Sequence, residues 1–337
     1  MNLEMLPSPE DRRRIKKIPH RFKGVRVLVI GDIMLDHYIR GSVSRLSPEA
    51  PVPIVGVNEE SFVPGGAGNV AANLAVLLSR VEIIGVVGED AAGLELVSHL
   101  SSLGVGSSGI VRDSGRVTSQ KCRVVAERQQ VVRYDRESIA PVSGKIEAQL
   151  LSGIAQGIKN SEAVILSDYG KGVLTPHILK SAIDLAHRAK IPVIVDPKIE
   201  HFKRYRRVTC VTPNLHEAWS GMRRIPKPGE AELEKLGQDM IRTLNCESAL
   251  ITRGPEGMSL FRKSKKTLHI PAQAREVFDV SGAGDTVIAT LSLSLAAGAT
   301  LDEAALISNY AAGIVVGKLG TATTTIDEIE NAIPLKP

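Results

Sequence analysis

Residues 25–32 read VRVLVIGD, a largely apolar and β-branched run that ends in glycine and aspartate. Such a run predicts a buried first strand with polar residues at its tip. Strand patterns recur at 81–87, 163–166, 193–195, 208–211 and 249–252, and helical patterns lie at 67–78, 91–102, 145–158, 176–189, 230–244, 283–297 and 301–317. This alternation predicts an α/β fold with a doubly wound, mostly parallel sheet.

Two stretches, residues 38–63 and 116–136, interrupt the alternation. The first contains three prolines and a strand pattern at 52–57, and the second predicts a hairpin of 117–126 and 130–134. Because no helix separates these strands, we expect a small β layer that projects from the main sheet as a lid. Ordinary edge strands are an equally good interpretation of the pattern alone.

The composition indicates a soluble globular protein. The chain has 337 residues, of which 43% are hydrophobic and 23% charged, while aromatic residues make up only 3%. The three cysteines, Cys122, Cys210 and Cys246, lack the CxxC spacing of a zinc site and suggest no disulfide framework. The chain shows neither a signal-peptide pattern nor an apolar run of about 20 residues. We therefore expect a cytoplasmic protein with no membrane partner.

The net charge of +5 is concentrated at the N-terminus, where residues 1–23 hold seven basic and three acidic residues. We expect these residues to form a solvated basic arm and residues 24–337 to form a single domain. Because the rest of the chain is nearly balanced in charge, we expect no nucleic-acid partner.

Residues 278–286, FDVSGAGDT, precede the apolar run 287–297 and predict a glycine-rich turn that opens a helix. The first N–H groups of a helix have no internal partner, so those of Gly282, Ala283 and Gly284 offer a site for a phosphate or a developing anion. Asp285 lies beside them, where a carboxylate can take a proton from an attacking hydroxyl. The combination suggests phosphoryl transfer, although an aspartate in a first helical turn can also be a simple dipole partner.

Glycines also open the predicted helix after residues 64–69, PGGAGN. Gly65 and Gly66 would let a ligand approach the backbone, and Asn69 offers a donor and acceptors for sugar hydroxyls. Asp36 follows the first strand, where α/β sheets bind ligands, and is a better candidate for gripping a sugar than Asp32. The alternatives are a tight turn that serves helix packing and, for Asp32, a turn cap.

Asn214 and Glu217 lie three residues apart in TPNLHE (212–217) and would share one side of a helical turn. An amide oxygen and a carboxylate suit Mg²⁺, although an N-cap with its capping-box acid has the same pattern. His216 between them is better explained by packing or hydrogen bonding than by catalysis. The nucleotide-binding Walker motif and the protein-kinase motifs are absent from the sequence.

Together these residues resemble the ribokinase-like (PfkB) family of carbohydrate kinases over nearly all of residues 24–332. Within that family the sequence is most similar to bacterial D-glycero-β-D-manno-heptose-7-phosphate kinases. The stretches that carry the resemblance are GDIMLD (31–36), SRLSPEAPVP (44–53), SDYGKG (167–172), TPNLHE (212–217) and GTATTT (320–325).

The resemblance implies a parallel-sheet core with a β lid that often joins two subunits, so we expect a homodimer. It implies ATP- and Mg²⁺-dependent phosphorylation of heptose 7-phosphate at the anomeric oxygen, which supplies ADP-heptose for lipopolysaccharide. Asp285 would be the base, and the N–H groups of Gly282, Ala283 and Gly284 would form the anion hole. The implied sugar ligands are Asp36, Gly65, Gly66 and Asn69, with Arg45, Arg128, Arg133 and Lys171 as candidates for the 7-phosphate.

Around ATP the resemblance implies a larger set of residues, of which Asn214 and Glu217 would also serve the metal. These residues are Lys198, Asn214, Leu215, His216, Glu217, Thr252, Gly254, Gly257 and Asn309. The sequence departs from the broad family at Val280, where threonine is usual. Heptose kinases often carry a fused nucleotidyltransferase domain, and we expect this chain to be a stand-alone kinase. The alternatives are a kinase of the same family for another sugar or sugar phosphate, and a non-catalytic regulator that binds a sugar.

Overall fold

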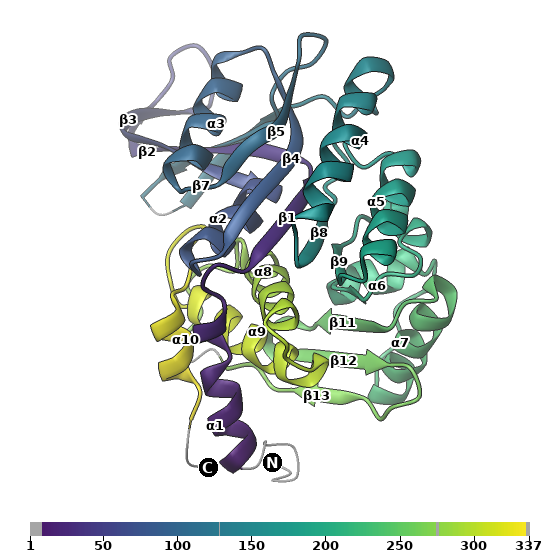
Figure 1. Ribbon diagram of the computed structural model, residues 1–337. Helices are drawn as coiled ribbons and strands as arrows, with labels where there is room; N and C mark the ends of the chain where they lie inside the picture. The colour runs from purple at the N-terminus through teal and green to yellow at the C-terminus, as the bar shows by residue number, and fades with distance from the viewer. Residues whose placement is uncertain (1–8, 128, 274–275, 335–337) are drawn as a thin grey trace.

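A nine-stranded sheet forms the centre of the computed structural model, which describes residues 9–127, 129–273 and 276–334 (Figure 1). Its strands are β1 (Arg26–Gly31), β4 (Arg80–Gly88), β5 (Gly106–Asp113), β8 (Ala163–Ser167), β9 (Val193–Asp196), β10 (Cys210–Val211), β11 (Ser248–Thr252), β12 (Met258–Arg262) and β13 (Leu268–Ile270). Their order is β13-β12-β11-β10-β9-β8-β1-β4-β5. The β11·β12 and β12·β13 pairings are antiparallel and the other pairings are parallel, so the doubly wound, mostly parallel sheet is confirmed.

Helices cover both faces of this sheet because its strands alternate apolar side chains between two cores. In β1, Val27 and Val29 join one core, while Leu28 and Ile30 join the other. The first core is covered by α1 (Pro9–Lys17), α2 (Ala67–Val76), α3 (Ala91–Ser102), α8 (Ala283–Ala296), α9 (Leu301–Val315) and α10 (Ile326–Ala332). The second is covered by α4 (Gly144–Lys159), α5 (Pro176–Ala189), α6 (Leu215–Gly221) and α7 (Glu230–Leu244). Short 3₁₀ helices lie at η2 (Pro19–Arg21), η3 (Ile199–Arg204) and η4 (Gly254–Glu256).

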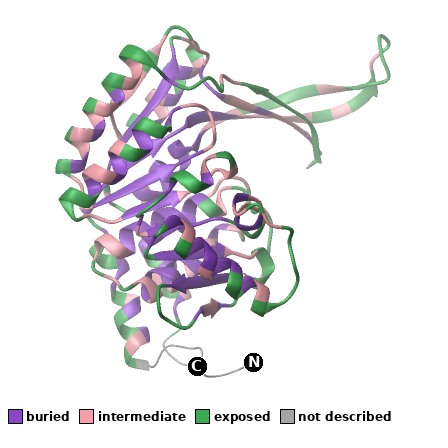
Figure 2. Ribbon diagram, turned by 90° about the vertical axis from the view of Figure 1, so that its right-hand side faces the viewer, coloured by how far each residue is buried: buried purple, intermediate pink, exposed green. Residues whose placement is uncertain are grey.

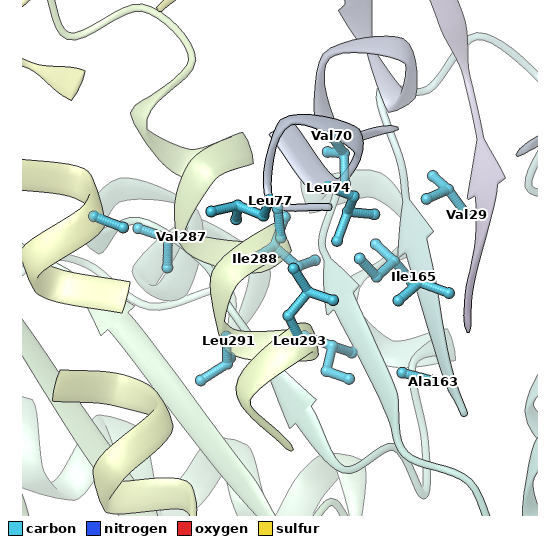
Figure 3. Packing of buried hydrophobic residues seen from close by; sticks show 14 of the residues in the cluster. Val29, Val70, Leu74, Leu77, Ala163, Ile165, Val287, Ile288, Leu291 and Leu293 are labelled. Carbon is cyan, nitrogen blue, oxygen red and sulfur yellow. The ribbon is translucent and has the colours of Figure 1, made fainter. Parts of the chain in front are cut away.

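The packing of α2 beside α8 decides where the two glycine-rich motifs meet. Figure 3 shows apolar side chains of both helices interleaved over the central strands. Those labelled are Val70, Leu74 and Leu77 of α2, Val287, Ile288, Leu291 and Leu293 of α8, and Val29, Ala163 and Ile165 of the sheet. This contact brings the first turn of α2 next to the first turn of α8.

A second sheet is built from the two stretches that were predicted to form a β layer. It consists of β2 (Ile33–Leu46), β3 (Pro53–Gly66), β6 (Gln120–Ala126) and β7 (Gln129–Arg136), in the order β3-β2-β6-β7. Figure 2 shows it leaving the buried central sheet as a largely exposed ribbon. The separate β layer is therefore confirmed, and the alternative of edge strands of the main sheet is wrong. One difference is that β2 begins at Ile33, so Asp36 lies on a strand of this second sheet.

The expectation of a solvated basic arm is wrong for residues 9–23. Ile15, Ile18 and Phe22 are buried in the same core as α2 and α8. Arg14 of α1 also forms an ion pair with Glu303 of α9 at 2.7 Å. The helical spacing of these three apolar residues, which the surrounding charges obscured, explains why the segment docks.

The other predicted strands and helices all have counterparts, although β10 covers only the last two residues of the predicted strand 208–211. Elements that were not predicted are α1, β2, β5, β12, β13 and α10, and of α6 only the first turn at 214–217 was expected. None of the helices within the described ranges has the length and apolar character needed to cross a membrane.

Candidate active site

Asp285 lies in the first turn of α8, where the tip of that helix meets α2 and the loop after β8. Its carboxylate is buried, and it accepts hydrogen bonds from Asn69 Nδ2 at 2.6 Å and from the Tyr169 hydroxyl at 2.8 Å. Burial raises the pKa of Asp285 to about 6, against the two hydrogen bonds, which favour the charged form. A carboxylate with a pKa near the working pH suits a general base.

The Asn69 amide is held in one orientation by a chain of hydrogen bonds. The Thr286 hydroxyl donates to Asn73 Oδ1 at 2.8 Å, and Asn73 Nδ2 donates to the backbone oxygen of Asn69 at 2.9 Å and to its Oδ1 at 3.3 Å. Because Oδ1 of Asn69 accepts a hydrogen bond from Asn73, Nδ2 of Asn69 is directed at Asp285. The sequence analysis missed Asn73 and Thr286, although they lie one helical turn after Asn69 and directly after Asp285.

Gly282 begins α8 with a backbone that only glycine adopts easily, at φ +79°. A Cβ at this position would lie 2.8 Å from Asn69 Nδ2 and 2.9 Å from Thr321 Cγ2. Neither Ala283 N–H nor Gly284 N–H has a partner within the helix, although the Ala283 N–H donates to the Val280 backbone oxygen at 3.3 Å. The structure thus brings the predicted anion hole and the predicted base to one helix terminus.

Asp36 is another buried carboxylate of the site. It forms an ion pair with Arg123 of β6, with Nη1 2.7 Å from Oδ1. A Cβ at Gly65 would lie 2.5 Å from Asp36 Oδ2, and one at Gly66 would lie 2.6 Å from the Asp32 backbone oxygen. Both glycines therefore allow a close approach that a larger residue would block. The sequence analysis missed Arg123, because its pairing with Asp36 depends on the register of β2 and β6.

Asp32 holds the loop after β8. Its carboxylate accepts hydrogen bonds from the backbone N–H groups of Tyr169 at 2.9 Å, Lys171 at 3.0 Å and Val173 at 3.0 Å. This loop carries the Tyr169 hydroxyl to Asp285. Asp32 therefore shapes the site through the backbone, which agrees with the turn-capping alternative.

A polar cavity of about 250 Å³ lies beside the tip of α8. Its lining residues come from the carboxyl ends of several parallel strands, where α/β sheets bind ligands. They include Asp196, Lys198, Asn214, Glu217, Thr252, Gly282, Gly284 and Asp285. Burial raises the pKa of Asp196 well above its ordinary value, and the nearby Asp285 and Glu217 raise it further. The cavity therefore holds more carboxylates than cations and suits a divalent cation.

Asn214 and Glu217 form a capping box at the start of α6, as the alternative interpretation held. Asn214 Oδ1 accepts from the Glu217 N–H, and Glu217 Oε2 accepts from the Asn214 N–H, both at 2.9 Å. Burial also raises the pKa of Glu217. Both residues still line the polar cavity, so the cap and a ligand role are compatible. Leu215 and His216 are exposed, and neither is among the residues that line the two cavities of this site.

A largely apolar cavity of about 220 Å³ continues from the polar one and shares Thr252 and Gly284 with it. Gly254, Gly257 and Asn309, all predicted around ATP, line this second cavity. Val280 also lines it and is itself 67% exposed. An apolar slot that opens into a polar cavity at a helix N-terminus has the character of a nucleotide site, with room for a base and then its phosphates.

The candidates for the sugar phosphate have different surroundings. Arg45 follows Asp36 by nine positions on β2, which is about 30 Å along an extended strand. Within one subunit, Arg45 therefore lies far from Asp36. Arg133 forms a two-pronged ion pair with Asp135, and Lys171 pairs with Glu137 at 2.6 Å. Arg128 lies outside the described residues.

Comparison with known proteins agrees with this arrangement. A family model described as pfkB family carbohydrate kinase matches residues 25–328. The "Bifunctional protein HldE" of Trichlorobacter lovleyi is 47% identical to this chain over 97% of its length, and that of Pelobacter propionicus is 46% identical over 96%. The chain spans 66% of the length of each of these two proteins.

Solved structures of sugar kinases share the fold. Arabidopsis thaliana ribokinase complexed with ribose and ATP superposes with a TM-score of 0.73 at 18% identity, covering 92% of this chain and 99% of that one. Phosphofructokinase-2 from Escherichia coli in complex with substrates and products superposes with a TM-score of 0.76 at 21% identity, covering 92% and 98%. Because the family model matches residues 25–328, which are most of this chain, the chain belongs to the pfkB family of carbohydrate kinases.

Proposed function

We propose that this chain transfers the γ-phosphoryl group of ATP to the anomeric oxygen of D-glycero-β-D-manno-heptose 7-phosphate, giving the 1,7-bisphosphate. The observation that carries the proposal is the buried Asp285 carboxylate at the N-terminus of α8, between Asn69 and the polar cavity. The heptose is favoured over other sugars by the motifs at 44–53 and 212–217 and by the similarity to bifunctional HldE proteins. Because the proposed reaction consumes ATP, we propose that it takes place in the cytoplasm.

In the proposed reaction Asp285 accepts the proton of the anomeric hydroxyl as that oxygen attacks the γ-phosphorus. The N–H groups of Gly282, Ala283 and Gly284 stabilise the charge that develops on the transferred group. Asp36 and Asn69 hold the sugar hydroxyls. Lys198 lines the same cavity and supplies a positive charge for the nucleotide phosphates.

Mg²⁺ fits the oxygen donors of the polar cavity, where it would neutralise charge on the phosphates of ATP. Asp196 and Glu217 would hold it, with Asn214 beside them. Within the described ranges, groups of three or more acidic, histidine or cysteine side chains that would form a metal cage are absent. Mg²⁺ is commonly held by one or two carboxylates together with substrate phosphates, so this donor set suits a metal that arrives with ATP.

We propose that the second sheet is a lid whose outer surface joins two subunits. Tyr134 and Val132 on β7 are 51% and 49% exposed. In the strand register they pair with Cys122 and Val124, whose side chains point away from the face that carries Asp36. An exposed apolar strip of this kind suits a second copy of the chain. A mass in solution of twice 36.1 kDa would support the dimer, and a monomer at all concentrations would contradict it.

The function is tested by measuring ADP release from ATP and Mg²⁺ with four acceptors. These are D-glycero-β-D-manno-heptose 7-phosphate, fructose 6-phosphate, ribose and adenosine. Strong turnover with the heptose phosphate alone supports the proposal. Turnover only with another acceptor would replace the substrate while keeping the kinase, and no turnover with any acceptor would favour a sugar-binding regulator.

The rate should depend on pH through Asp285, because only its charged form accepts a proton. Its folded-state pKa of about 6 predicts that kcat/KM falls as pH drops through about 6, well above the ordinary range of an aspartate. Tyr169→Phe removes a hydrogen bond that favours the charged form, so it should move this fall to higher pH. A fall in kcat/KM near pH 4 instead of pH 6 would contradict the assignment. So would a fall near pH 6 that Tyr169→Phe does not move.

Glu217→Gln should weaken the metal site while preserving the helix cap. A glutamine carbonyl can still accept the Asn214 N–H hydrogen bond, but the ligand charge is lost. We expect the Mg²⁺ concentration for half-maximal rate to rise about tenfold, with the KM for the sugar and the Tm nearly unchanged. An unchanged Mg²⁺ requirement would remove Glu217 from the metal site.

A further inference from the structure

The face of the lid that carries Asp36 also carries most of its cations. In the strand register Lys121 of β6 lies opposite Asp36 of β2 and opposite Asp135 of β7. Arg123 lies opposite Tyr38 and Arg133 in the same way. Residues directly opposite in a sheet, and residues two apart along a strand, point to the same side. These charges therefore face the sugar side of the site.

The three cations that act most on Lys121 already have a carboxylate partner. The pairs are Arg123 with Asp36, Arg133 with Asp135, and Lys171 with Glu137. Lys121 differs, because its ammonium group forms no ion pair with any carboxylate of the described residues and lies 5.2 Å from the centre of the Tyr169 ring. Lys121 is thus the cation of this group that keeps no ion pair within the described residues.

The surroundings of Lys121 are those of a site that lacks an anion. The side chain is half-buried, and its pKa is lowered by burial and by the neighbouring Arg123, Arg133 and Lys171, while Asp36 acts in the opposite direction. An anion that binds beside a half-buried cation, among other cations, lowers the free energy of the charged form of that cation. A phosphate, which carries up to two negative charges and several acceptor oxygens, would complement this cluster.

Tyr169 contacts both Lys121 and Asp285. The Tyr169 hydroxyl donates to Asp285, and the ammonium group of Lys121 lies over the ring of the same tyrosine. A sugar whose reacting hydroxyl lies at Asp285 would therefore extend along Tyr169 toward Lys121 with its opposite end.

We propose that Lys121 binds the phosphate at the far end of the sugar and makes the site specific for a phosphorylated substrate. This inference rests on the proposed function. Lys121 replaces Arg45, Arg133 and Lys171 as the leading phosphate ligand, because Arg45 is remote on β2 and the other two are already paired within the chain.

The test is Lys121→Gln, assayed with D-glycero-β-D-manno-heptose 7-phosphate and with the same heptose lacking the phosphate. We expect the KM for the phosphorylated heptose to rise about 10- to 100-fold, as the loss of a charged hydrogen bond predicts. The KM for the unphosphorylated heptose and for ATP should change less than about twofold. Lys121→Arg keeps the charge and should retain most of the preference for the phosphorylated sugar.

Lys180→Gln is the matched control, since Lys180 is exposed on α5 and pairs with Asp184. It should leave every constant unchanged, and the Tm of each variant should match that of the parent. Lys121 also helps to lower the pKa of Asp285, so it has an alternative role through the base. If Lys121→Gln lowers kcat equally with both heptoses and moves the acid limb to higher pH, that role holds and the inference is overturned.

A binding measurement separates this inference from the proposed function. Calorimetry with fructose 6-phosphate and fructose requires no turnover, so it applies even if the heptose is not the substrate. Tighter binding of the phosphorylated sugar by the parent protein, lost in Lys121→Gln, supports the phosphate site. Equal binding of the two sugars by the parent, or a preference that survives Lys121→Gln, overturns it.

Discussion

Asp285→Asn is expected to lower kcat about 10²- to 10⁴-fold, the range that removal of a general base produces. Asparagine has nearly the same shape but cannot accept the proton of the anomeric hydroxyl. ATP binding should persist, because Gly254, Gly257 and Asn309 line the apolar cavity, to whose lining Asp285 does not belong. The measurements are the rate of ADP release with the heptose phosphate and the Kd for ATP by calorimetry.

Asp184→Asn provides the control for this substitution, because Asp184 is a surface residue of α5 that pairs with Lys180 and Arg207. It should leave kcat unchanged. The Tm of Asp285→Asn should not fall at pH 7: the folded-state pKa of Asp285 lies above its ordinary 3.8, so its ionisation opposes folding above that pH. Near-normal turnover in Asp285→Asn would contradict the role of Asp285 as the base.

Gly282→Ala should have the second largest effect, a fall in kcat of about 10²-fold. An alanine must adopt φ near +79°, and its Cβ would lie 2.8 Å from Asn69 Nδ2, the group that orients Asp285. The helix tip or Asn69 must move, and small displacements of catalytic groups cost rates of this size. Steady-state kinetics with the heptose phosphate, together with the pH profile, would measure the change.

Gly298→Ala separates the cost of the backbone angle from the effect on the site. Gly298 follows the other end of α8 at φ +86°, and a Cβ there would meet nothing within 4 Å. Both variants carry the left-handed alanine, which costs about 1 kcal/mol or more in the free energy of unfolding. Only Gly282→Ala should lose activity, and equal kinetics in the two variants would show that the tip of α8 does not position the reacting groups.

The local parts of this protein were predictable because they depend on neighbours in the sequence. The alternation of apolar runs predicted the strands of the parallel sheet, as in residues 25–30. The glycines at 282 and 284 predicted the start of α8, with Asp285 in its first turn. Helix α1 was missed, because the buried apolar residues of this segment, Ile15 in α1 and Ile18 and Phe22 after it, lie among many charges, and only the core that receives them buries the segment.

The α/β alternation and the aspartate at the helix tip could be predicted from the sequence, whereas the separate second sheet could not be distinguished from edge strands of the main sheet. Which groups meet at that tip depends on packing between distant segments, since Asn69 and Asp285 are 216 positions apart and Tyr169 and Asp285 are 116 apart. The register of β2 against β6 likewise places both Lys121 and Arg123 on the face that carries Asp36, and of the two it is Arg123 that forms the ion pair with Asp36. The physical reason is that periodicity and backbone preferences act within one turn or strand, whereas burial, hydrogen bonding and charge pairing depend on which distant elements pack together.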